Sequence, residues 1–188
     1  MANPPPILAL PELRNILQDK QGVVCLHPMS EVETRKPGFH EVLLRLLNAR
    51  GDEIQPRQFI PTAVQHTMMP WLDMLTLDLL ETQVRVLKET PPTPISINIS
   101  RHSLLHQPYM DRLQSEAWKD LLPHLMFELK TGDITRDVTV LKNLIGLKAG
   151  GTTLCVDYQQ GGTKAVEFAT NLEFEFLKMS FGFWILRI

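Results

Sequence analysis

Strand-like and helix-like segments alternate about six times along the chain, and this order is the strongest constraint on its fold. Apolar or alternating runs predict strands at residues 22–28, 39–47, 95–100, 125–130, 154–157 and 174–179. Because a helix between two strands can return the chain parallel to the first strand, the order predicts βαβ units. The expected fold class is α/β, either a TIM-like (β/α) barrel or an open doubly wound sheet.

Helical spacing of apolar residues is clearest from Trp71 to Lys88. Weaker patterns predict a helix starting near Pro11, a polar helix around residues 109–117 and a short helix over residues 164–170. A further helix is expected to be capped by Asp133, to end at Gly150 and to carry apolar residues at Val138, Leu141, Leu144, Ile145 and Leu147.

The composition is that of one ordinary globular domain of 188 residues. A net charge of -2 gives no electrostatic reason to expect nucleic acid or anionic lipid as a partner. Cys25 and Cys155 lie in apolar strand-like runs, where a free cysteine behaves as a small hydrophobic residue, so we expect free thiols in a reducing compartment rather than a disulfide. No signal peptide and no apolar run of membrane-spanning length is present, which predicts a cytoplasmic protein.

Polar residues near the predicted strand ends are the candidates for chemistry, because ligands of parallel α/β proteins bind at these ends. They are His27, Glu41, Arg45, Asn98, Glu128, Asp157 and Lys178. Four of them supply oxygen atoms, and such a set suits Mg²⁺, Mn²⁺ or Ca²⁺. The alternative is that each is a capped or ion-paired residue at the end of a strand.

These segments together resemble the EAL-domain family, the bacterial phosphodiesterases of cyclic di-GMP. The family's YQP corresponds to Leu26-His27-Pro28, and its EALLR corresponds to "EVLLR" from Glu41. The segment "IQPRQFIPTA" is similar to SPxEFIPxAE, and "ISINIS" contains the family's metal-binding Asn as Asn98. The stretches "FELK", "CVDYQQGG" and "LKMS" correspond to ExTE, DDFGTG and LKID. The resemblance implies a TIM-like barrel, of which this chain covers about six of eight strand–helix units.

The resemblance also implies roles for these residues. Glu41, Asn98, Glu128 and Asp157 would bind one Mg or Mn ion, with Ca as an inhibitory substitute. Arg45 and His27 would contact the nucleotide, Arg45 as a charged fork on a phosphate. Lys178 would orient the attacking water in an active enzyme, where two metal ions clamp the phosphate.

Departures from the family pattern argue against hydrolysis. Tyr158 stands where the family has the second Asp of DDFGTG, and a neutral phenol cannot replace a carboxylate ligand, so the second metal site is expected to be lost. The second Glu of ExTE is replaced by Thr131, and Lys130 adds a positive charge that would oppose a metal ion. The loop after Tyr158 starts with two glutamines, and Ser180 replaces the Asp of LKID.

We therefore expect a single EAL-like domain over residues 1–188, with a flexible Pro-rich arm at residues 1–10 and an atypical apolar tail at residues 181–188. The tail, or a partner, would cover the open edge of the sheet. The predicted role is a catalytically inactive regulator that binds a protein partner, cyclic di-GMP or a second copy of itself. The alternatives are an active metal-dependent phosphodiesterase and a truncated remnant without a defined role.

Overall fold

The computed structural model describes residues 6–30, 37–87, 94–130, 137–158, 174–179 and 184–187, with some strand and helix residues described by their backbone alone. The chain divides into two compact units, one formed by residues 1–25 and 43–88 and the other by residues 26–42 and 89–188. Strands β1 (Gly22–Ser30) and β2 (Pro37–Leu47) contribute residues to both units. Each unit is described by itself below.

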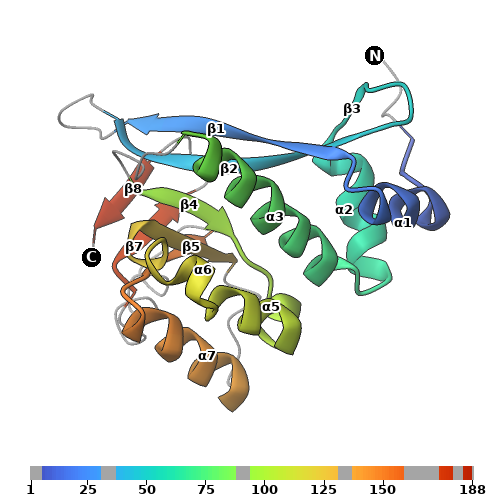
Figure 1. The fold of residues 1–188 in the computed structure, drawn as a ribbon. Coiled ribbons are helices and arrows are strands. Elements are labelled where there is room, and N and C mark those ends of the chain that lie inside the picture. Colours follow the sequence, from blue (N-terminus) through green and yellow to red (C-terminus); the bar gives the residue numbers. More distant parts are fainter. Residues whose placement is uncertain are drawn as a thin grey trace. The chain divides into compact units, whose positions relative to one another are not determined.

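The first unit is mostly helical (Figure 1). Its other elements are α1 (Leu10–Gln18), β3 (Glu53–Ile54), α2 (Pro56–Gln65) and α3 (Met69–Leu87). β3 pairs antiparallel with β2 after the turn that carries Gly51, whose φ of 84° suits a glycine. The core of this unit consists of Leu8, Leu13, Ile16, Leu46, Ile54, Phe59, Ala63, Leu72 and Leu75. The predicted helices near Pro11 and from Trp71 to Lys88 are thus confirmed.

Residues of the predicted N-terminal arm contact this core. Leu8 is buried, and its backbone N–H donates to the carbonyl oxygen of Gln58 at 2.8 Å. The hydroxyl of Thr62 donates to the carbonyl oxygen of Leu8 at 2.5 Å. Residues 1–5 of the arm lie outside the described residues.

The second unit contains the parallel strands. In addition to parts of β1 and β2 it holds β4 (Ile95–Asn98), α4 (Arg101–Leu104), α5 (Gln107–Leu113), α6 (Glu116–Lys119), η1 (Leu122–His124), β5 (Leu125–Lys130), α7 (Val138–Ala149), β6 (Thr153–Tyr158), β7 (Phe176–Met179) and β8 (Trp184–Arg187). The strand order is β1-β2-β4-β5-β6-β7-β8. Helices α5, α6 and α7 lie along one side of β4 and β5 (Figure 1).

Strands β2, β4, β5, β6 and β7 run parallel to one another in this order. Their register aligns one apolar row, since Val42 pairs with Ile97, Ile97 with Phe127, and Phe127 with Leu154. These four side chains are at most 3% exposed. Because side chains alternate along a strand, the neighbouring residues form a second row on the opposite face. That second row carries the candidate site.

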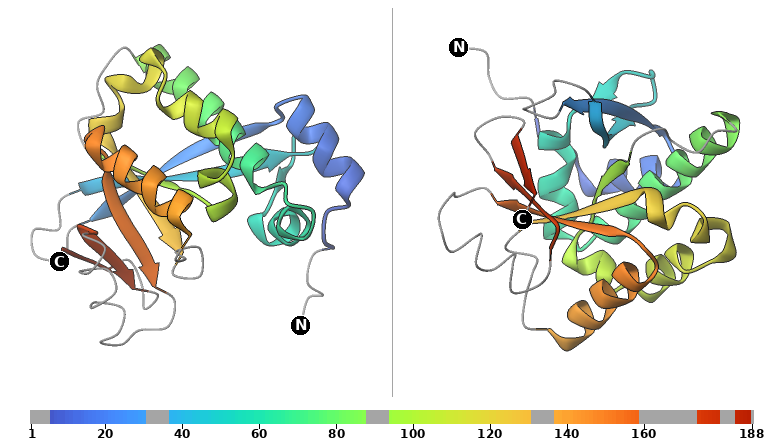
Figure 2. Two further views of the ribbon diagram at one scale, coloured as in Figure 1. Left: turned by 90° about the horizontal axis from the view of Figure 1, so that it is seen from below. Right: turned by 90° about the vertical axis from the view of Figure 1, so that its left-hand side faces the viewer.

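The tail pairs with the last parallel strand. β8 runs antiparallel to β7, with Leu177 opposite Leu186 and Lys178 opposite Ile185, and Figure 2 shows the two strands side by side. The prediction that residues of the tail cover the sheet edge next to the last strand is therefore confirmed for the backbone of residues 184–187. An antiparallel strand satisfies the backbone N–H and C=O groups of β7 that a missing parallel neighbour would leave unpaired.

The predictions of one polar helix at residues 109–117 and of a cap at Asp133 are wrong. Residues 109–117 do not form one polar helix, because α5 and α6 are separate and Tyr109, Leu113 and Trp118 are fully buried. Between the two helices the hydroxyl of Ser115 donates to the carbonyl oxygen of Arg112 at 2.7 Å, a local bond that competes with helix continuation.

The cap and the buried face of α7 also differ from the expectation. Asp137 is the N-cap residue, and its carboxylate accepts from the backbone N–H groups of Thr139 and Val140. Asp133 lies outside the described residues, as does the helix expected at residues 164–170. Val138 and Ile145 are 77% and 68% exposed, and the buried face consists of Val140, Leu144 and Leu147. The predicted end of the helix at Gly150 is confirmed.

The cysteines differ in exposure although both lie in strands. Cys155 is fully buried on β6, whereas Cys25 is exposed on β1, which ends the strand order. The neighbouring Val24 is buried, so successive side chains alternate in exposure here and Cys25 lies on the exposed side of β1. Both thiols are free. No helix among the described residues is long and apolar enough to cross a membrane.

Two helices of the first unit end in the same motif with unusual residues. At the end of α2, Thr67 donates to Val64 at 3.3 Å and Met68 donates to Ala63 at 2.7 Å, which are the two backbone bonds of a Schellman motif. Lys20 and Gln21 repeat this pattern at the end of α1. Such motifs favour glycine, yet Thr67 and Lys20 have φ values of 53° and 51°.

Thr67→Gly is expected to raise the free energy of unfolding by about 1 kcal/mol, because it removes the cost of a β-branched residue in the left-handed region. Lys20→Gly is the matched comparison, and we expect a smaller gain in the free energy of unfolding because it also removes the 2.7 Å ion pair with Asp78 on α3. Urea unfolding of the three proteins measures both effects. A loss of stability in Thr67→Gly would contradict the strain argument.

Candidate functional site

Polar side chains form the second row of the sheet in the second unit. Glu41 pairs in register with Ser96, Asn98 with Glu128, and Glu128 with Cys155. Asp157 pairs with Lys130 on one side and with Lys178 on the other. Residues that pair in register on neighbouring strands share a face, so five of the seven predicted site residues lie on one face of the sheet.

Lys178 joins two of these residues directly. Its Nζ atom lies 2.8 Å from Oε1 of Glu41 and 2.9 Å from Oε2 of Glu128. The three side chains are 19%, 13% and 0% exposed, so this is a largely buried cluster. We call Lys178, Glu41 and Glu128 the lysine–carboxylate cluster.

The cluster also reports on the curvature of the sheet. β2 and β7 are separated by β4, β5 and β6 in the strand order. At the usual spacing of neighbouring strands, a flat sheet would place β2 and β7 roughly 19 Å apart. The contact of Lys178 with Glu41 requires the sheet to curve around the polar row, as the strands of a barrel do.

Burial controls the protonation of the cluster. Burial raises the pKa of Glu128, and the ammonium group of Lys178 and the hydroxyl of Ser96 offset this in part. For Lys178, burial lowers the pKa, but the charges of Glu128 and Glu41 and their hydrogen bonds together raise it above its usual value. Lys178 is therefore a cation throughout the physiological range.

Ser96 and Cys155 belong to this row and were not predicted as site residues. The Ser96 hydroxyl donates to Oε1 of Glu128, and Ser96 is fully buried. Cys155 pairs in register with Glu128, and burial raises the pKa of its thiol. Period-two spacing from Asn98 and Asp157 places both on the same face, so the sequence contained the signal that could have identified them.

Asn98 and Asp157 lie on the same face of the sheet as the lysine–carboxylate cluster. Asn98 is exposed at the end of β4, one strand away from Glu128. Asp157 is half-buried between two lysines in register, Lys130 and Lys178. Lys130 is exposed, so its ammonium group is accessible from solvent at the end of β5.

The two residues predicted to contact nucleotide lie on the first two strands. His27 is exposed on β1. Arg45 is part of the first unit, where its Nε lies 3.9 Å from Glu53 and its Nη1 donates to the carbonyl oxygen of Leu44 at 3.1 Å. Tyr158, the residue from which the loss of the second metal site was predicted, is the last residue of β6, and its backbone lies opposite Met179. Thr131, Ser180 and the loop that starts at Gln159 lie outside the described residues.

Comparison with known proteins identifies a shared family. The sequence matches the family described as EAL domain over residues 11–183. No curated protein matches it.

Solved structures share the fold at low sequence identity. The S helix-GGDEF-EAL region of LapD from Vibrio cholerae, bound to c-di-GMP, superposes with a TM-score of 0.74 at 14% identity over 89% of this chain and 41% of that chain. The FimX EAL domain of Xanthomonas citri in complex with c-diGMP superposes with a TM-score of 0.77 at 16% identity, over 92% of this chain and 69% of that chain. The FimX EAL domain of Pseudomonas aeruginosa bound to c-di-GMP superposes with a TM-score of 0.69 at 20% identity, over 90% of this chain and 70% of that chain.

These structures confirm the predicted TIM-like α/β fold of the EAL type. The chain spans less than half of the LapD chain that it matches.

The metal ligands implied by the family match in residue type but not in arrangement. Glu41, Asn98, Glu128 and Asp157 offer oxygen atoms, which suit Mg²⁺ or Mn²⁺. The gap between the Glu41 and Glu128 carboxylates, however, contains the Lys178 ammonium group. Within the described ranges, no three acidic, His or Cys side chains are grouped so that they could hold a metal ion. The arrangement is that of an internal ion-pair cluster and does not fit a metal centre.

Lys178→Met is expected to lower the free energy of unfolding by about 3 kcal/mol at neutral pH, because it leaves Glu128 buried without its cation. Lys130→Met is the matched control on the same face. We expect its free energy of unfolding to stay within about 0.5 kcal/mol of that of the unchanged protein. Urea unfolding at about pH 7 measures both.

The loss should depend on pH in a defined direction. The pKa of Glu128 is raised in the folded state, so ionising Glu128 costs stability as pH rises from its unfolded value of 4.5 through the folded value. Without Lys178 this cost grows. The loss of free energy of unfolding in Lys178→Met should therefore be larger at about pH 8 than at about pH 5. An equal deficit at both values would contradict the role of Lys178 as the counter-ion of Glu128.

Proposed function

The chain belongs to the EAL domain family, and on this basis we propose that it is a regulatory EAL domain of cyclic di-GMP signalling that acts by binding and not by hydrolysis. The family comprises phosphodiesterases of cyclic di-GMP, and related EAL structures hold this nucleotide. The proposed ligand is cyclic di-GMP, and the proposed output is the binding of a protein partner or a second copy of the chain.

The observation that carries this proposal is the position of Lys178. An enzyme that needs two metal ions must direct its carboxylates at those ions. Both Glu41 and Glu128 are instead directed at one ammonium group, at 2.8 and 2.9 Å. The positive charge of Lys178 offsets one of their two negative charges within the protein.

The sequence supports the same conclusion. Tyr158 follows Asp157 where the family has a second carboxylate, and Thr131 stands in the place of a second Glu. Lys130 stands beside Asp157 in register, where a positive charge opposes a cation and favours an anion. Each change removes attraction for a metal ion, and the last adds attraction for a phosphate group.

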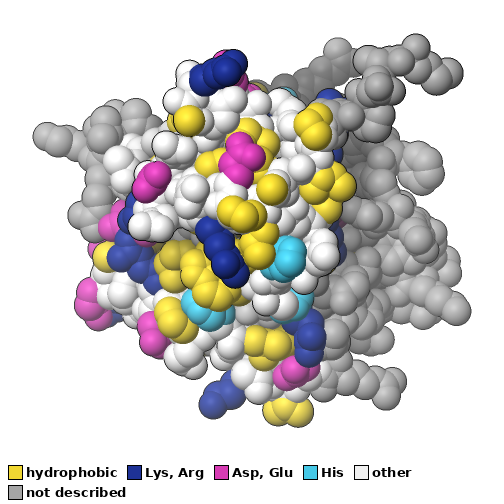
Figure 3. Space-filling model, turned by 90° about the vertical axis from the view of Figure 1, so that its right-hand side faces the viewer, with side chains coloured by type: hydrophobic (Ala, Val, Ile, Leu, Met, Phe, Trp, Pro, Cys, Tyr) yellow, Lys and Arg dark blue, Asp and Glu magenta, His cyan; other side chains and the backbone are white. Residues whose placement is uncertain are grey.

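Nucleotide binding by this chain relies on local charge. The net charge is -2, and the face drawn in Figure 3 mixes basic, acidic and hydrophobic side chains. An anionic ligand is therefore attracted by individual residues and not by the field of the whole protein. We propose Lys130 for this role from its place in the row, and Arg45 and His27 from the family pattern.

A second candidate function is the family's phosphodiesterase activity. It is favoured by the presence of Glu41, Asn98, Glu128, Asp157 and Lys178 together on one face. Lys178 would then orient the attacking water. Metal ions would have to enter a cluster that already contains a cation, which places this candidate second.

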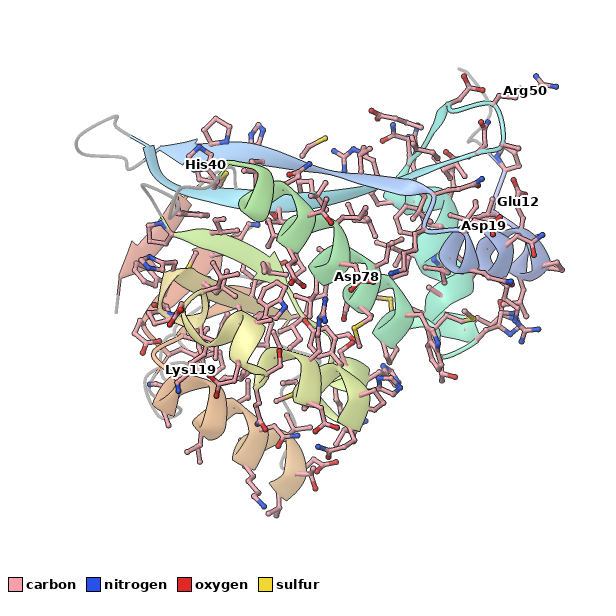
Figure 4. All side chains as sticks on the ribbon, in the orientation of Figure 1. Glu12, Asp19, His40, Arg50, Asp78 and Lys119 are labelled. Carbon is pink, nitrogen blue, oxygen red and sulfur yellow. The ribbon has the colours of Figure 1, made fainter. Side chains whose placement is uncertain are left out.

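Titration calorimetry with cyclic di-GMP tests the proposed function. We expect a dissociation constant of about 1–100 µM without added metal, and a loss of at least about tenfold in Arg45→Met because a charged contact to phosphate is removed. Arg50→Met is the matched control, since Arg50 is an exposed arginine near the β2–β3 turn (Figure 4). No binding at about 1 mM nucleotide would reject cyclic di-GMP as the ligand.

A hydrolysis assay with Mn²⁺ separates the two candidate functions. We expect no turnover above that of Glu41→Gln, because the loss of parts that act as one catalytic unit costs orders of magnitude in rate. Turnover that Glu41→Gln abolishes would establish the phosphodiesterase in place of the binding module.

A further inference from the structure

The geometry of the polar row points to a resident cation. We propose that the Lys178 ammonium group occupies the place that a divalent ion would need between Glu41 and Glu128, so that a metal ion binds this site only by displacing Lys178. This inference goes beyond the proposed function because it concerns the cation and not the nucleotide.

The Lys178 ammonium group and a divalent metal ion would need the same space between the two carboxylates. Lys178 donates to Glu41 and Glu128 at 2.8 and 2.9 Å, which are normal charge-assisted hydrogen bonds. A Mg²⁺ ion needs its ligand oxygens at about 2.0–2.1 Å and therefore needs the space between these two carboxylates. An ammonium group and a divalent cation repel each other at such separations. The two cannot share the gap.

The remaining contacts hold the carboxylate toward the lysine. One oxygen of Glu128 accepts from Ser96 while the other accepts from Lys178. Glu128 is completely buried, so it has no aqueous alternative to these partners. Both oxygens of Glu128 therefore have hydrogen-bond donors within the protein.

A second observation supports the same conclusion from another strand. Asp157, the acid that would complete the metal site, stands in register between Lys130 and Lys178. Fully ionised, the three acids Glu41, Glu128 and Asp157 and these two lysines carry one net negative charge (three minus two). The row therefore attracts a divalent ion far less than three carboxylates alone would.

Mn²⁺ binding, measured by electron paramagnetic resonance without nucleotide, tests the proposal. Lys178→Met should bind Mn²⁺ at least about tenfold more tightly than the unchanged protein, because it frees two carboxylates from their cation. Lys178→Arg should bind as weakly as the unchanged protein, because it keeps the charge. Lys142→Met, on the exposed surface of α7, is the control for removing a lysine elsewhere.

Equal or weaker Mn²⁺ binding by a folded Lys178→Met protein would overturn the proposal. If that variant does not fold, the unchanged protein still decides the question. The NMR signal of the Lys178 ammonium group, assigned by its loss in Lys178→Arg, is followed while Mg²⁺ is added and Mg²⁺ binding is measured by calorimetry.

Two outcomes of the magnesium titration support the proposal, namely no Mg²⁺ binding, or binding that removes or shifts the Lys178 signal in proportion to occupancy. Binding of Mg²⁺ with an unchanged Lys178 signal overturns it. Because no nucleotide is present, failure of this inference leaves the calorimetric test with cyclic di-GMP independent.

Discussion

The contact of Lys178 with Glu41 and Glu128 is the interaction on which the polar side of the second unit depends. It places a positive charge between two largely buried carboxylates, one of which has no exposed surface. Burying either carboxylate alone would cost several kcal/mol, and the shared cation reduces that cost. The same contact joins β2 to β7 across three intervening strands, so charge compensation and sheet curvature are linked.

This linkage joins three of the predicted site residues in one internal charge cluster. Glu41, Glu128 and Lys178 link β2, β5 and β7, and replacing Lys178 alone leaves the buried Glu128 carboxylate without its cation. Lys130, exposed at the end of β5 on the same face, is the residue proposed to attract the phosphate groups of cyclic di-GMP.

The end of the sheet shows a related compensation. The family match ends at residue 183, yet residues 184–187 form β8 and pair with β7 in antiparallel direction. Backbone hydrogen bonds do not depend on side-chain identity, so a sequence outside the matched range can pair with the edge of a parallel strand. The edge of β7 is thus covered by a strand that lies beyond the matched range.

The sequence by itself determined the α/β class, the six strands and the row of acids and Lys178, because period-two alternation and motif spacing are local. It misplaced the N-cap of α7 and joined α5 to α6, because the local hydrogen bonds of Asp137 and Ser115 decide these features. Only the tertiary structure decided that Lys178 contacts both glutamates. That contact depends on the register of five strands and the curvature of their sheet, which no single segment encodes.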